Sequence, residues 1–210
     1  MTKPKIIQQG AEANIILSGR FREKPFIIKD RIKKGYRIPE LDIKIRGRRT
    51  KSEAKLLEKA SKIINSPEPF LQPSIRHSSK LKMPFIDGKK LSDYLDKFPL
   101  KKQKEICKLI GESTAKLHDA DIIHGDLTTS NMILKNNKIY FIDFGLGFVS
   151  HKFEDKAVDI HLLKQALEAK HFKNWQTLFR EVFKGYSISK DHKIVLERLN
   201  KVEKRGRYKH

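Results

Sequence analysis

Residues 122–145 read IIHGDLTTSNMILKNNKIYFIDFG, and this stretch decides the fold. It contains His-Gly-Asp126, then Asn131 five residues later, and then Asp143-Phe-Gly after a further twelve residues. Two short apolar runs flank the Lys-Asn-Asn-Lys at 135–138, a pattern that predicts a hairpin with an asparagine-containing turn. Such a hairpin brings Asn131 and Asp143 to the same end of the ribbon, so the spacing predicts a single site.

The residue types at this predicted site suit phosphoryl transfer of the protein-kinase pattern. The carboxylate of Asp126 could accept the proton of an attacking hydroxyl. The amide oxygen of Asn131 and the carboxylate of Asp143 are hard oxygen ligands for Mg²⁺ on nucleotide phosphates. The alternative is a polar loop between buried strands whose acids cap turns, and the joint spacing of the three residues argues against it.

A site of this kind also needs a loop that accepts the triphosphate. Residues 8–15, Gln-Gln-Gly-Ala-Glu-Ala-Asn-Ile, lie where a glycine-rich loop is expected, although only one of its three glycines is present. Small residues let the backbone approach phosphates, while an ordinary hairpin turn is the alternative. The residues that we predict to contact the nucleotide here are Gly10, Ala11, Glu12, Ala13 and Ile15.

The run Pro-Phe-Ile-Ile-Lys29 predicts an apolar strand that ends in a lysine, as in the strand whose lysine holds the α- and β-phosphates. Strand alternation decides which face the amine of Lys29 reaches. Lys33 and Lys34 are alternatives in a chain this rich in lysine.

The partner of that lysine is expected to be a glutamate on the next helix. The segment 50–60 has helical apolar spacing, and Glu53 is the acid that opens it. Glu58 and Glu40 are lesser candidates. Thr50 and Glu53 also match a capping box, in which Glu53 would bond back to the start of the helix.

The order of elements predicts an α+β, two-lobed, protein-kinase-like fold. Residues 1–84 are expected to form a small β-rich nucleotide-binding lobe around one long helix, 85–203 a reduced, mainly helical catalytic lobe, and 204–210 a basic tail. No Ala-Pro-Glu follows Asp143-Phe-Gly, and Asp159 already lies in an apolar helical pattern. The sequence therefore predicts no long activation segment, and it places ATP between the lobes.

Several motifs together resemble the small atypical Ser/Thr protein kinase/ATPase subunit of the KEOPS complex, a family related to the RIO kinases. They are Gly10-Ala-Glu-Ala, Ile28-Lys29, Lys34-Gly-Tyr-Arg-Ile-Pro-Glu-Leu-Asp42, Arg48-Arg-Thr50 before Glu53-Ala54, His124-Gly-Asp-Leu-Thr-Thr-Ser-Asn131, Asp143-Phe-Gly-Leu-Gly147 and Arg205-Gly-Arg207. They span nearly the whole chain.

The resemblance implies an ATP- and Mg²⁺-dependent kinase or ATPase that serves threonylcarbamoyladenosine formation in tRNA. It implies that Asp126 is the catalytic base, that Asn131 and Asp143 bind magnesium, that Lys29 binds phosphate and that Glu53 pairs with Lys29. It also implies as partners the threonylcarbamoyl-transferase subunit, other KEOPS subunits and tRNA.

The segment 81–88 departs from that family at the predicted adenine hinge. Pro84 stands where the family usually has an acidic residue, and proline has no N–H to donate. We predict that Met83 contacts the nucleotide, but the hinge bonds to adenine are less well defined than the phosphate end.

Composition points to a polyanionic partner independently of the family. Lys plus Arg number 46 against 25 Asp plus Glu, which gives a formal net charge of +21 and a pI near 10.0. A field of this sign attracts nucleic acid, and tRNA in particular. The residues that we expect to contact nucleic acid or protein partners are Arg46, Arg48, Arg49, Lys204, Arg205, Arg207 and Lys209.

Other features favour the cytoplasm. The single cysteine, Cys107, excludes an intramolecular disulfide and lies in a predicted buried helix position. The chain starts with Met-Thr-Lys-Pro-Lys, which is unlike a signal peptide, and no apolar run reaches the roughly 20 residues that span a bilayer. The histidines show no metal-ligand spacing, and His124 is expected to be a structural member of the catalytic loop.

Two other functions use part of the same pattern. A small-molecule phosphotransferase of the aminoglycoside-kinase type also has His-Gly-Asp and a downstream Asp, but it would need an acidic substrate pocket, which a basic chain with a short C-terminal lobe disfavours. A catalytically silent scaffold that binds tRNA and protein is the second alternative. It has no need of the chemistry of Lys29, Asp126, Asn131 and Asp143.

Overall fold

A four-stranded antiparallel sheet forms the first part of the computed structural model, which describes residues 4–21, 24–70 and 79–206. The strands β1 (Lys5–Gln9), β2 (Ala13–Phe21), β3 (Lys24–Arg31) and β4 (Lys80–Pro84) are hydrogen-bonded in that order. The N–H of Gly10 donates to the carbonyl of Ala13 (3.0 Å) and closes the predicted turn between β1 and β2. The predicted strand ending at Lys29 is confirmed as part of β3.

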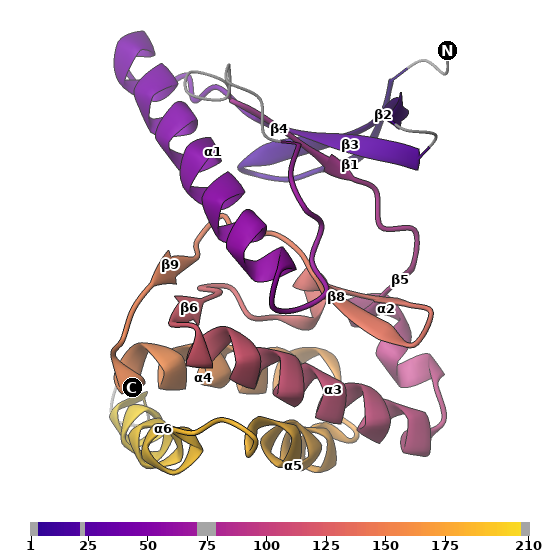
Figure 1. Cartoon of the computed structure of the whole chain (residues 1–210), viewed down its shortest axis with the longest axis vertical. Coiled ribbons are helices and arrows are strands. Elements are labelled where there is room, and N and C mark those ends of the chain that lie inside the picture. Colours follow the sequence, from indigo (N-terminus) through magenta and orange to yellow (C-terminus); the bar gives the residue numbers. More distant parts are fainter. Residues whose placement is uncertain (1–3, 22–23, 71–78, 207–210) are drawn as a thin grey trace.

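One long helix, α1 (Pro39–Ser61), packs beside this sheet, as Figure 1 shows. Pro39 occupies the first turn, where its missing N–H costs no hydrogen bond. Because the helix begins at residue 39, Thr50 and Glu53 lie in its interior, and both are buried. The capping-box interpretation of these two residues was therefore wrong: only a helix starting near residue 50 could have such a cap.

The chain then passes into the mainly helical lobe through β5 (Lys89–Lys90), α2 (Leu91–Tyr94) and the 3₁₀ turn η2 (Leu95–Lys97). The central helix α3 (Leu100–Asp119) buries residues at helical spacing and packs against α5 (Trp175–Tyr186). Two glycines permit this close packing. A β-carbon on Gly111 would lie 2.0 Å from the carbonyl oxygen of Val182, and one on Gly185 would lie 2.0 Å from that of Lys108.

The predicted ribbon follows α3. The short strand β6 (Ile122–Ile123) precedes the 3₁₀ turn η3 (Thr129–Asn131), and β7 (Met132–Lys135) and β8 (Lys138–Phe141) form the antiparallel hairpin. Asn136 and Asn137 have φ angles of 49° and 57°, as a two-residue type I′ turn requires. The strand β9 (Phe148–Val149) pairs with β6 and closes this region.

Two further helices complete the lobe, α4 (Phe153–Lys170) and α6 (His192–Gly206). Only residues 146–152, which include β9, separate Asp143-Phe-Gly from α4, so the expected lack of a long activation segment is confirmed. The helix α6 continues to Gly206, so Lys204 and Arg205 belong to it and not to a separate tail starting at 204. Arg207 and Lys209 lie outside the described residues.

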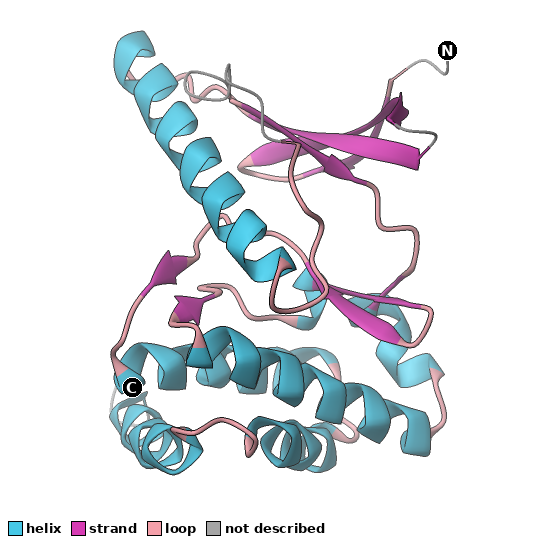
Figure 2. Ribbon diagram, viewed as in Figure 1, coloured by secondary structure: helices cyan, strands magenta, loops and turns pink. Residues whose placement is uncertain are grey.

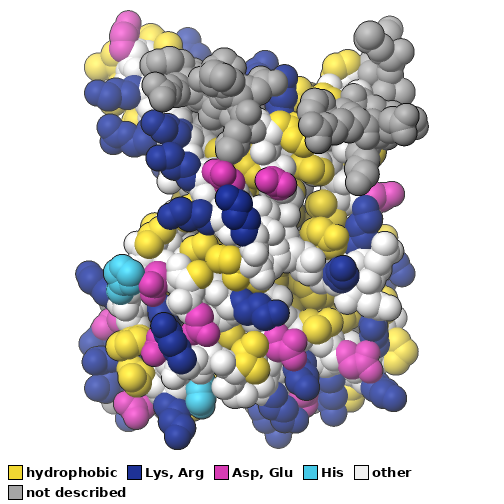
Figure 3. Space-filling model, viewed as in Figure 1, with side chains coloured by type: hydrophobic (Ala, Val, Ile, Leu, Met, Phe, Trp, Pro, Cys, Tyr) yellow, Lys and Arg dark blue, Asp and Glu magenta, His cyan; other side chains and the backbone are white. Residues whose placement is uncertain are grey.

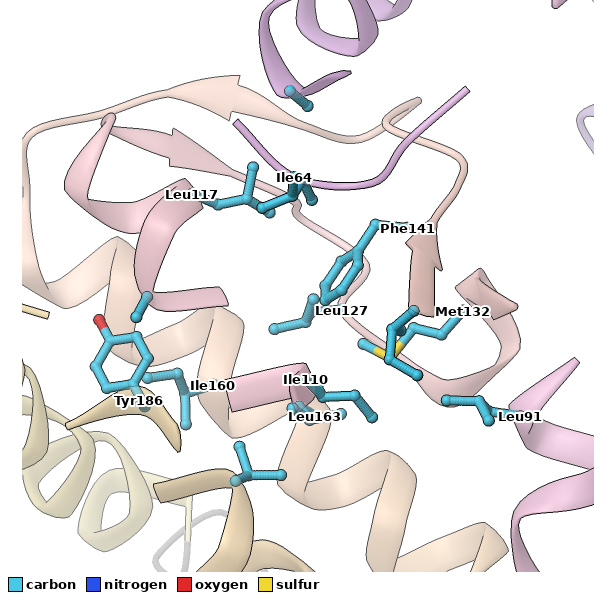
Figure 4. Close-up of a cluster of buried hydrophobic side chains, with 14 of the residues drawn as sticks. Ile64, Leu91, Ile110, Leu117, Leu127, Met132, Phe141, Ile160, Leu163 and Tyr186 are labelled. Carbon is cyan, nitrogen blue, oxygen red and sulfur yellow. The ribbon is translucent and has the colours of Figure 1, made fainter. Parts of the chain in front are cut away.

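Figure 2 shows the resulting division, with one helix beside the upper sheet and the remaining helices in the lower lobe. The predicted α+β, two-lobed fold is therefore confirmed. A hydrophobic core runs between the two parts. In Figure 4, Ile64, just beyond α1, lies beside Leu117 of α3 and near Phe141 of β8. The N–H of Phe141 donates to the carbonyl of Asn65 (3.0 Å), which fixes the segment after α1 against the β7–β8 hairpin.

Candidate active site

A cavity of about 580 Å³ opens between the four-stranded sheet, α1 and the region around the β7–β8 hairpin. It collects residues that lie far apart in the sequence, from the β1–β2 loop to Leu146. Every residue predicted for catalysis or nucleotide contact lines it: Gly10, Ala11, Glu12, Ala13, Ile15, Lys29, Glu53, Met83, Asp126, Asn131 and Asp143.

Lys29 is the centre of the charged end of this cavity. Its Nζ donates to Oε1 of Glu53 (2.8 Å) and to Oδ1 of Asp143 (2.6 Å). Lys29 is 6% exposed and Glu53 is 1% exposed, so this ion pair is shielded from water and from salt screening. The predicted pairing of Lys29 with Glu53 is confirmed.

Arg31 belongs to the same cluster, and the sequence analysis missed it. Its Nη2 donates to Oε2 of Glu53 (2.6 Å), so each oxygen of this buried carboxylate accepts from a different cation. Arg31 follows Lys29 by two residues on β3, and alternate residues of a strand point to the same face. That alternation was the available signal, but the protein-kinase pattern specifies only one cation on this strand.

Asp159 of α4 holds the loop that carries His124, Gly125 and Asp126, a role that the sequence analysis did not assign. Its Oδ2 accepts from the backbone N–H of His124 (2.8 Å), and its Oδ1 accepts from that of Gly125 (2.9 Å). The side chain is 1% exposed and Nε2 of His118 lies 3.2 Å from Oδ2. Burial raises the pKa of Asp159, but the hydrogen bond and charge of His118, together with His124, outweigh it and hold this pKa below the ordinary value of an aspartate.

His124 itself is buried and structural, as predicted. Its Nε2 lies 3.1 Å from the carbonyl oxygen of Ile142, and its ring is 4.5 Å from that of Phe144. Gly125 has a φ of +78°, and a β-carbon there would lie 2.3 Å from the carbonyl oxygen of Leu146. Glycine is therefore required between His124 and Asp126, since no other residue tolerates both the backbone conformation and the close approach.

Asn131 links the loop that carries Asp126 to the residue that follows the β7–β8 hairpin, Ile142. Its Nδ2 donates to the backbone carbonyl and to Oδ2 of Asp126, both at 2.9 Å. Its own carbonyl accepts from the N–H of Ile142 (3.0 Å), which places Asn131 beside Asp143 at the end of the hairpin, as predicted. With the amide nitrogen engaged in this way, the amide Oδ1 of Asn131 is the atom that can bind a metal ion.

The oxygen atoms present fit a magnesium ion bound together with a nucleotide. Asn131 and Asp143 supply two hard oxygen ligands in one wall of the cavity, and Mg²⁺ usually completes its shell with water and substrate phosphates. Burial raises the pKa of Asp143, but the Lys29 ammonium and the N–H of Gly145 outweigh it, so this pKa lies below its usual value. The carboxylate is therefore ionised at neutral pH, as a metal ligand must be. Among the described residues no group of three or more His, Cys, Asp or Glu forms a metal site.

Apolar side chains also line the cavity and suit a flat base, among them Ile15, Ile27, Met83 and Ile133. Met83 is buried and is paired with Ile27 between β4 and β3. Pro84 ends β4 on the edge of the sheet, a position that tolerates proline. The N–H of Phe85 is already used by the carbonyl of Pro25 (3.0 Å).

The loop between β1 and β2 is fastened to its surroundings by cations. Nη1 of Arg49 donates to Oε2 of Glu12 (2.8 Å), and Nζ of Lys34 donates to the carbonyl of Ala11 (2.6 Å). Arg49 also lines the cavity. Arg49 of α1 thus compensates the charge of Glu12 in this loop in the absence of a nucleotide.

The predicted partner-binding arginines differ in their availability. Arg46 donates to Oδ2 of the buried Asp42 (2.6 Å), and Arg49 pairs with Glu12 at the surface, so both arginines already have a partner within the chain. Arg48 is exposed. Near the C-terminal end, Lys204 is exposed and Arg205 donates to Glu154 (2.5 Å). No helix within the described ranges is long and apolar enough to cross a membrane.

Comparisons with known proteins agree on one family. The RIO domain family matches residues 42–160. The KEOPS complex subunit Bud32 of Pyrococcus abyssi is 43% identical over 98% of this chain and 96% of its own length. A probable serine/threonine-protein kinase BUD32 homolog of Archaeoglobus fulgidus is 39% identical over 87% of this chain and 88% of its own length.

A probable bifunctional tRNA threonylcarbamoyladenosine biosynthesis protein of Methanococcus vannielii is 44% identical over 97% of this chain, but the match spans only 36% of that longer protein. Among solved structures, a Rio2 kinase–ADP/Mg²⁺–phosphoaspartate complex of Chaetomium thermophilum aligns with a TM-score of 0.61 and 14% identity. It covers 98% of this chain and 71% of that one, a likeness that concerns the fold.

Proposed function

This chain belongs to the RIO-domain family, alongside the KEOPS subunit Bud32, and from this we propose that it is a Mg-ATP-dependent phosphotransferase or ATPase. We further propose that it acts in the cytoplasm as a KEOPS subunit that supports threonylcarbamoyladenosine modification of tRNA. The names of its relatives support this assignment, since they include KEOPS Bud32, a BUD32 kinase homolog and tRNA threonylcarbamoyladenosine biosynthesis proteins.

One observation carries the catalytic part of the proposal. Lys29 bridges Glu53 and Asp143 at 2.8 and 2.6 Å, in the same cavity as Asp126 and Asn131. A scaffold without chemistry would have no use for a buried lysine held between two acids, because burying such charges is unfavourable unless their arrangement is needed. An arrangement of this kind positions phosphates and keeps a metal ligand ionised.

Each residue then has a role that follows from its place. Lys29 is positioned by Glu53 to hold the α- and β-phosphates, and its bond to Asp143 can be exchanged for a phosphate oxygen when the nucleotide enters. Asp126, oriented by Asn131, accepts the proton of the attacking hydroxyl or water. Bound Mg²⁺ would supply charge neutralisation at the transferring phosphate, held by Asn131 and Asp143. The apolar wall around Met83 would receive the adenine.

The seven residues between Gly145 and α4 leave no room for an activation segment that could complete an acceptor site. We therefore expect basal turnover below the roughly 1–100 s⁻¹ usual for kinases. The transferase subunit, other KEOPS subunits and tRNA are the proposed partners that raise it.

The test is release of labelled phosphate from γ-labelled ATP, measured with and without tRNA and the transferase partner. Native protein is compared with Asp143→Ala and with Asp93→Ala, a matched change at an exposed aspartate on α2. We expect turnover that rises with tRNA and partner, that is lost in Asp143→Ala, and that is retained in Asp93→Ala. Equal turnover in all three proteins would refute the catalytic proposal, and no turnover in any of them under any condition would favour a silent scaffold.

A further inference from the structure

The outer face of α1 carries a continuous row of cations. The row consists of Lys44, Arg48, Lys51, Lys55 and Lys59 of α1 and of Lys62, the residue directly after the helix. Its members follow one another at intervals of three or four residues, and all six are exposed. We call this set the α1 cation row. At 3.6 residues per turn its members lie within an arc of about 80°, and at 1.5 Å per residue the row is about 27 Å long.

The row lies opposite the side of α1 that packs inward. Residues such as Glu53, Leu57 and Ala60 are buried on that side, roughly half a turn away from the row. On the face drawn in Figure 3, Lys and Arg side chains gather where Figure 1 places α1. The same helix thus holds Glu53 toward the cavity and presents the row to the exterior.

The cations of the row are also largely without acids. Within the part of the chain that the structure describes, Lys44, Arg48, Lys51, Lys55 and Lys59 form no ion pair, and only Lys62 has one, with Glu58 at 3.5 Å. Like charges three or four residues apart destabilise a helix by about 0.2–0.5 kcal/mol per pair. By contrast, the nearby Arg46 and Arg49 are both paired with carboxylates. The uncompensated row therefore weakens the helix unless an external polyanion covers it.

We propose that the α1 cation row binds the phosphate backbone of folded RNA. The proposal rests on the proposed role in tRNA modification, which would supply an RNA substrate, and it states which surface of the chain contacts that RNA. Lys and Arg side chains held in a line suit regularly spaced phosphates. The helix α1 contains no aromatic residue, so Arg48 is the one planar side chain of the row on which an unpaired base could stack. The row therefore recognises paired, backbone-presenting RNA in preference to single strands.

Binding at the row has a consequence for the cavity. Glu53 holds Lys29 from the inner side of α1, so RNA on the outer side contacts the helix that orients the phosphate-binding lysine. Relief of like-charge repulsion along α1 by bound RNA would stabilise the helix in its present position.

The experiment compares two triple variants of the full chain that have the same charge. One removes three cations of the row (Lys44→Gln, Lys51→Gln and Lys55→Gln). The control removes three exposed lysines on α3 and α6 for which no ion pair is observed within the described ranges (Lys101→Gln, Lys108→Gln and Lys193→Gln). Each triple variant lowers the formal charge from +21 to +18, and glutamine keeps good helix propensity. Circular dichroism establishes that both fold as the native chain does.

Binding is measured by fluorescence anisotropy with a labelled 20-base-pair RNA hairpin and with a labelled U20 strand, over a range of KCl concentrations. We expect the row variant to bind the hairpin at least about tenfold more weakly than the control. The slope of log K against log salt should fall by roughly two to three, because each phosphate that is no longer neutralised lowers it by about 0.7–0.9. Native protein should prefer the hairpin to U20.

Equal hairpin affinity of the two variants would overturn the proposal, as would failure of the native chain to bind the hairpin at low salt. A row variant that binds RNA as the control does but no longer binds phosphatidylserine vesicles would overturn the RNA proposal and indicate that the row binds a membrane surface. ATP turnover is measured on the same preparations. If the native chain shows no ATP turnover and the row variant still loses RNA binding, the catalytic proposal is contradicted and the RNA-binding proposal is supported.

Discussion

The pair formed by Arg31 and Glu53 offers a sharp quantitative test of the site's construction. Arg31→Met removes a guanidinium that is 6% exposed and lies 2.6 Å from a carboxylate that is 1% exposed. Removing one partner of a buried ion pair typically costs about 3–5 kcal/mol when the other charge is left uncompensated. Here Lys29 still contacts Glu53, so we expect a smaller loss of about 2–3 kcal/mol in the free energy of unfolding.

The assay is a double-mutant cycle followed by thermal and urea unfolding, with the native chain, Arg31→Met, Glu53→Gln and the double variant. For a chain of this size a loss of about 2–3 kcal/mol corresponds to a fall in Tm of about 4–12 °C. The coupling energy between the two sites should exceed about 1 kcal/mol, since residues in direct contact do not act additively. Lys101→Met is the control, because a substitution at an exposed site usually alters stability by less than about 0.5 kcal/mol.

The reasoning would be refuted by an Arg31→Met variant that is no less stable than the control, or by a coupling energy within about 0.5 kcal/mol of zero. Either result would mean that Lys29 alone satisfies Glu53, and that Arg31 contributes nothing to holding α1 against the sheet.

Three further changes test other parts of the structure. The pKa of Asp159 is lowered from 3.8 in the folded chain, so its stabilisation is present above that value and is lost as the pH falls through the folded pKa. Asp159→Asn should therefore be less stable than the native chain at pH 7 but should lose less stability between pH 5 and pH 3, as measured by urea unfolding at each pH. Gly111→Ala should lower the free energy of unfolding by about 2 kcal/mol or more, because its β-carbon would lie 2.0 Å from a carbonyl oxygen. Gly35→Ala, with no described atom within 4 Å of the new carbon, should change the free energy of unfolding by less than about 0.5 kcal/mol. Equal Tm values for Gly111→Ala and Gly35→Ala would contradict the α3–α5 packing. Asn137, with a φ of 57°, should tolerate glycine without loss, whereas valine should cost about 1–2 kcal/mol; similar urea midpoints for the two variants would rule out a type I′ turn.

Local patterns were sufficient for the catalytic ribbon. The Lys-Asn-Asn-Lys turn between two apolar runs determines that Asn131 and Asp143 meet, because a two-residue hairpin fixes its own register. The strand that contains Lys29, and the short interval between Asp143-Phe-Gly and the helix that contains Asp159, can likewise be predicted from neighbouring residues. From these, the sequence alone predicted the two-lobed fold, the lack of a long activation segment and several of the residues that line the cavity, though not Arg31.

Only the tertiary structure decided how residues far apart in the sequence pair with one another. The start of α1 at Pro39 removed the capping-box alternative for Glu53, and the same helix sorts its cations into paired inner residues, such as Arg46, and an unpaired outer row. The bonds of Arg31 to Glu53 and of Asp159 to the catalytic loop join positions 22 and 34–35 residues apart. Periodicity reports which face of an element is apolar, but it does not report which charge lies across from another. That pairing is set by how the helices and strands pack together.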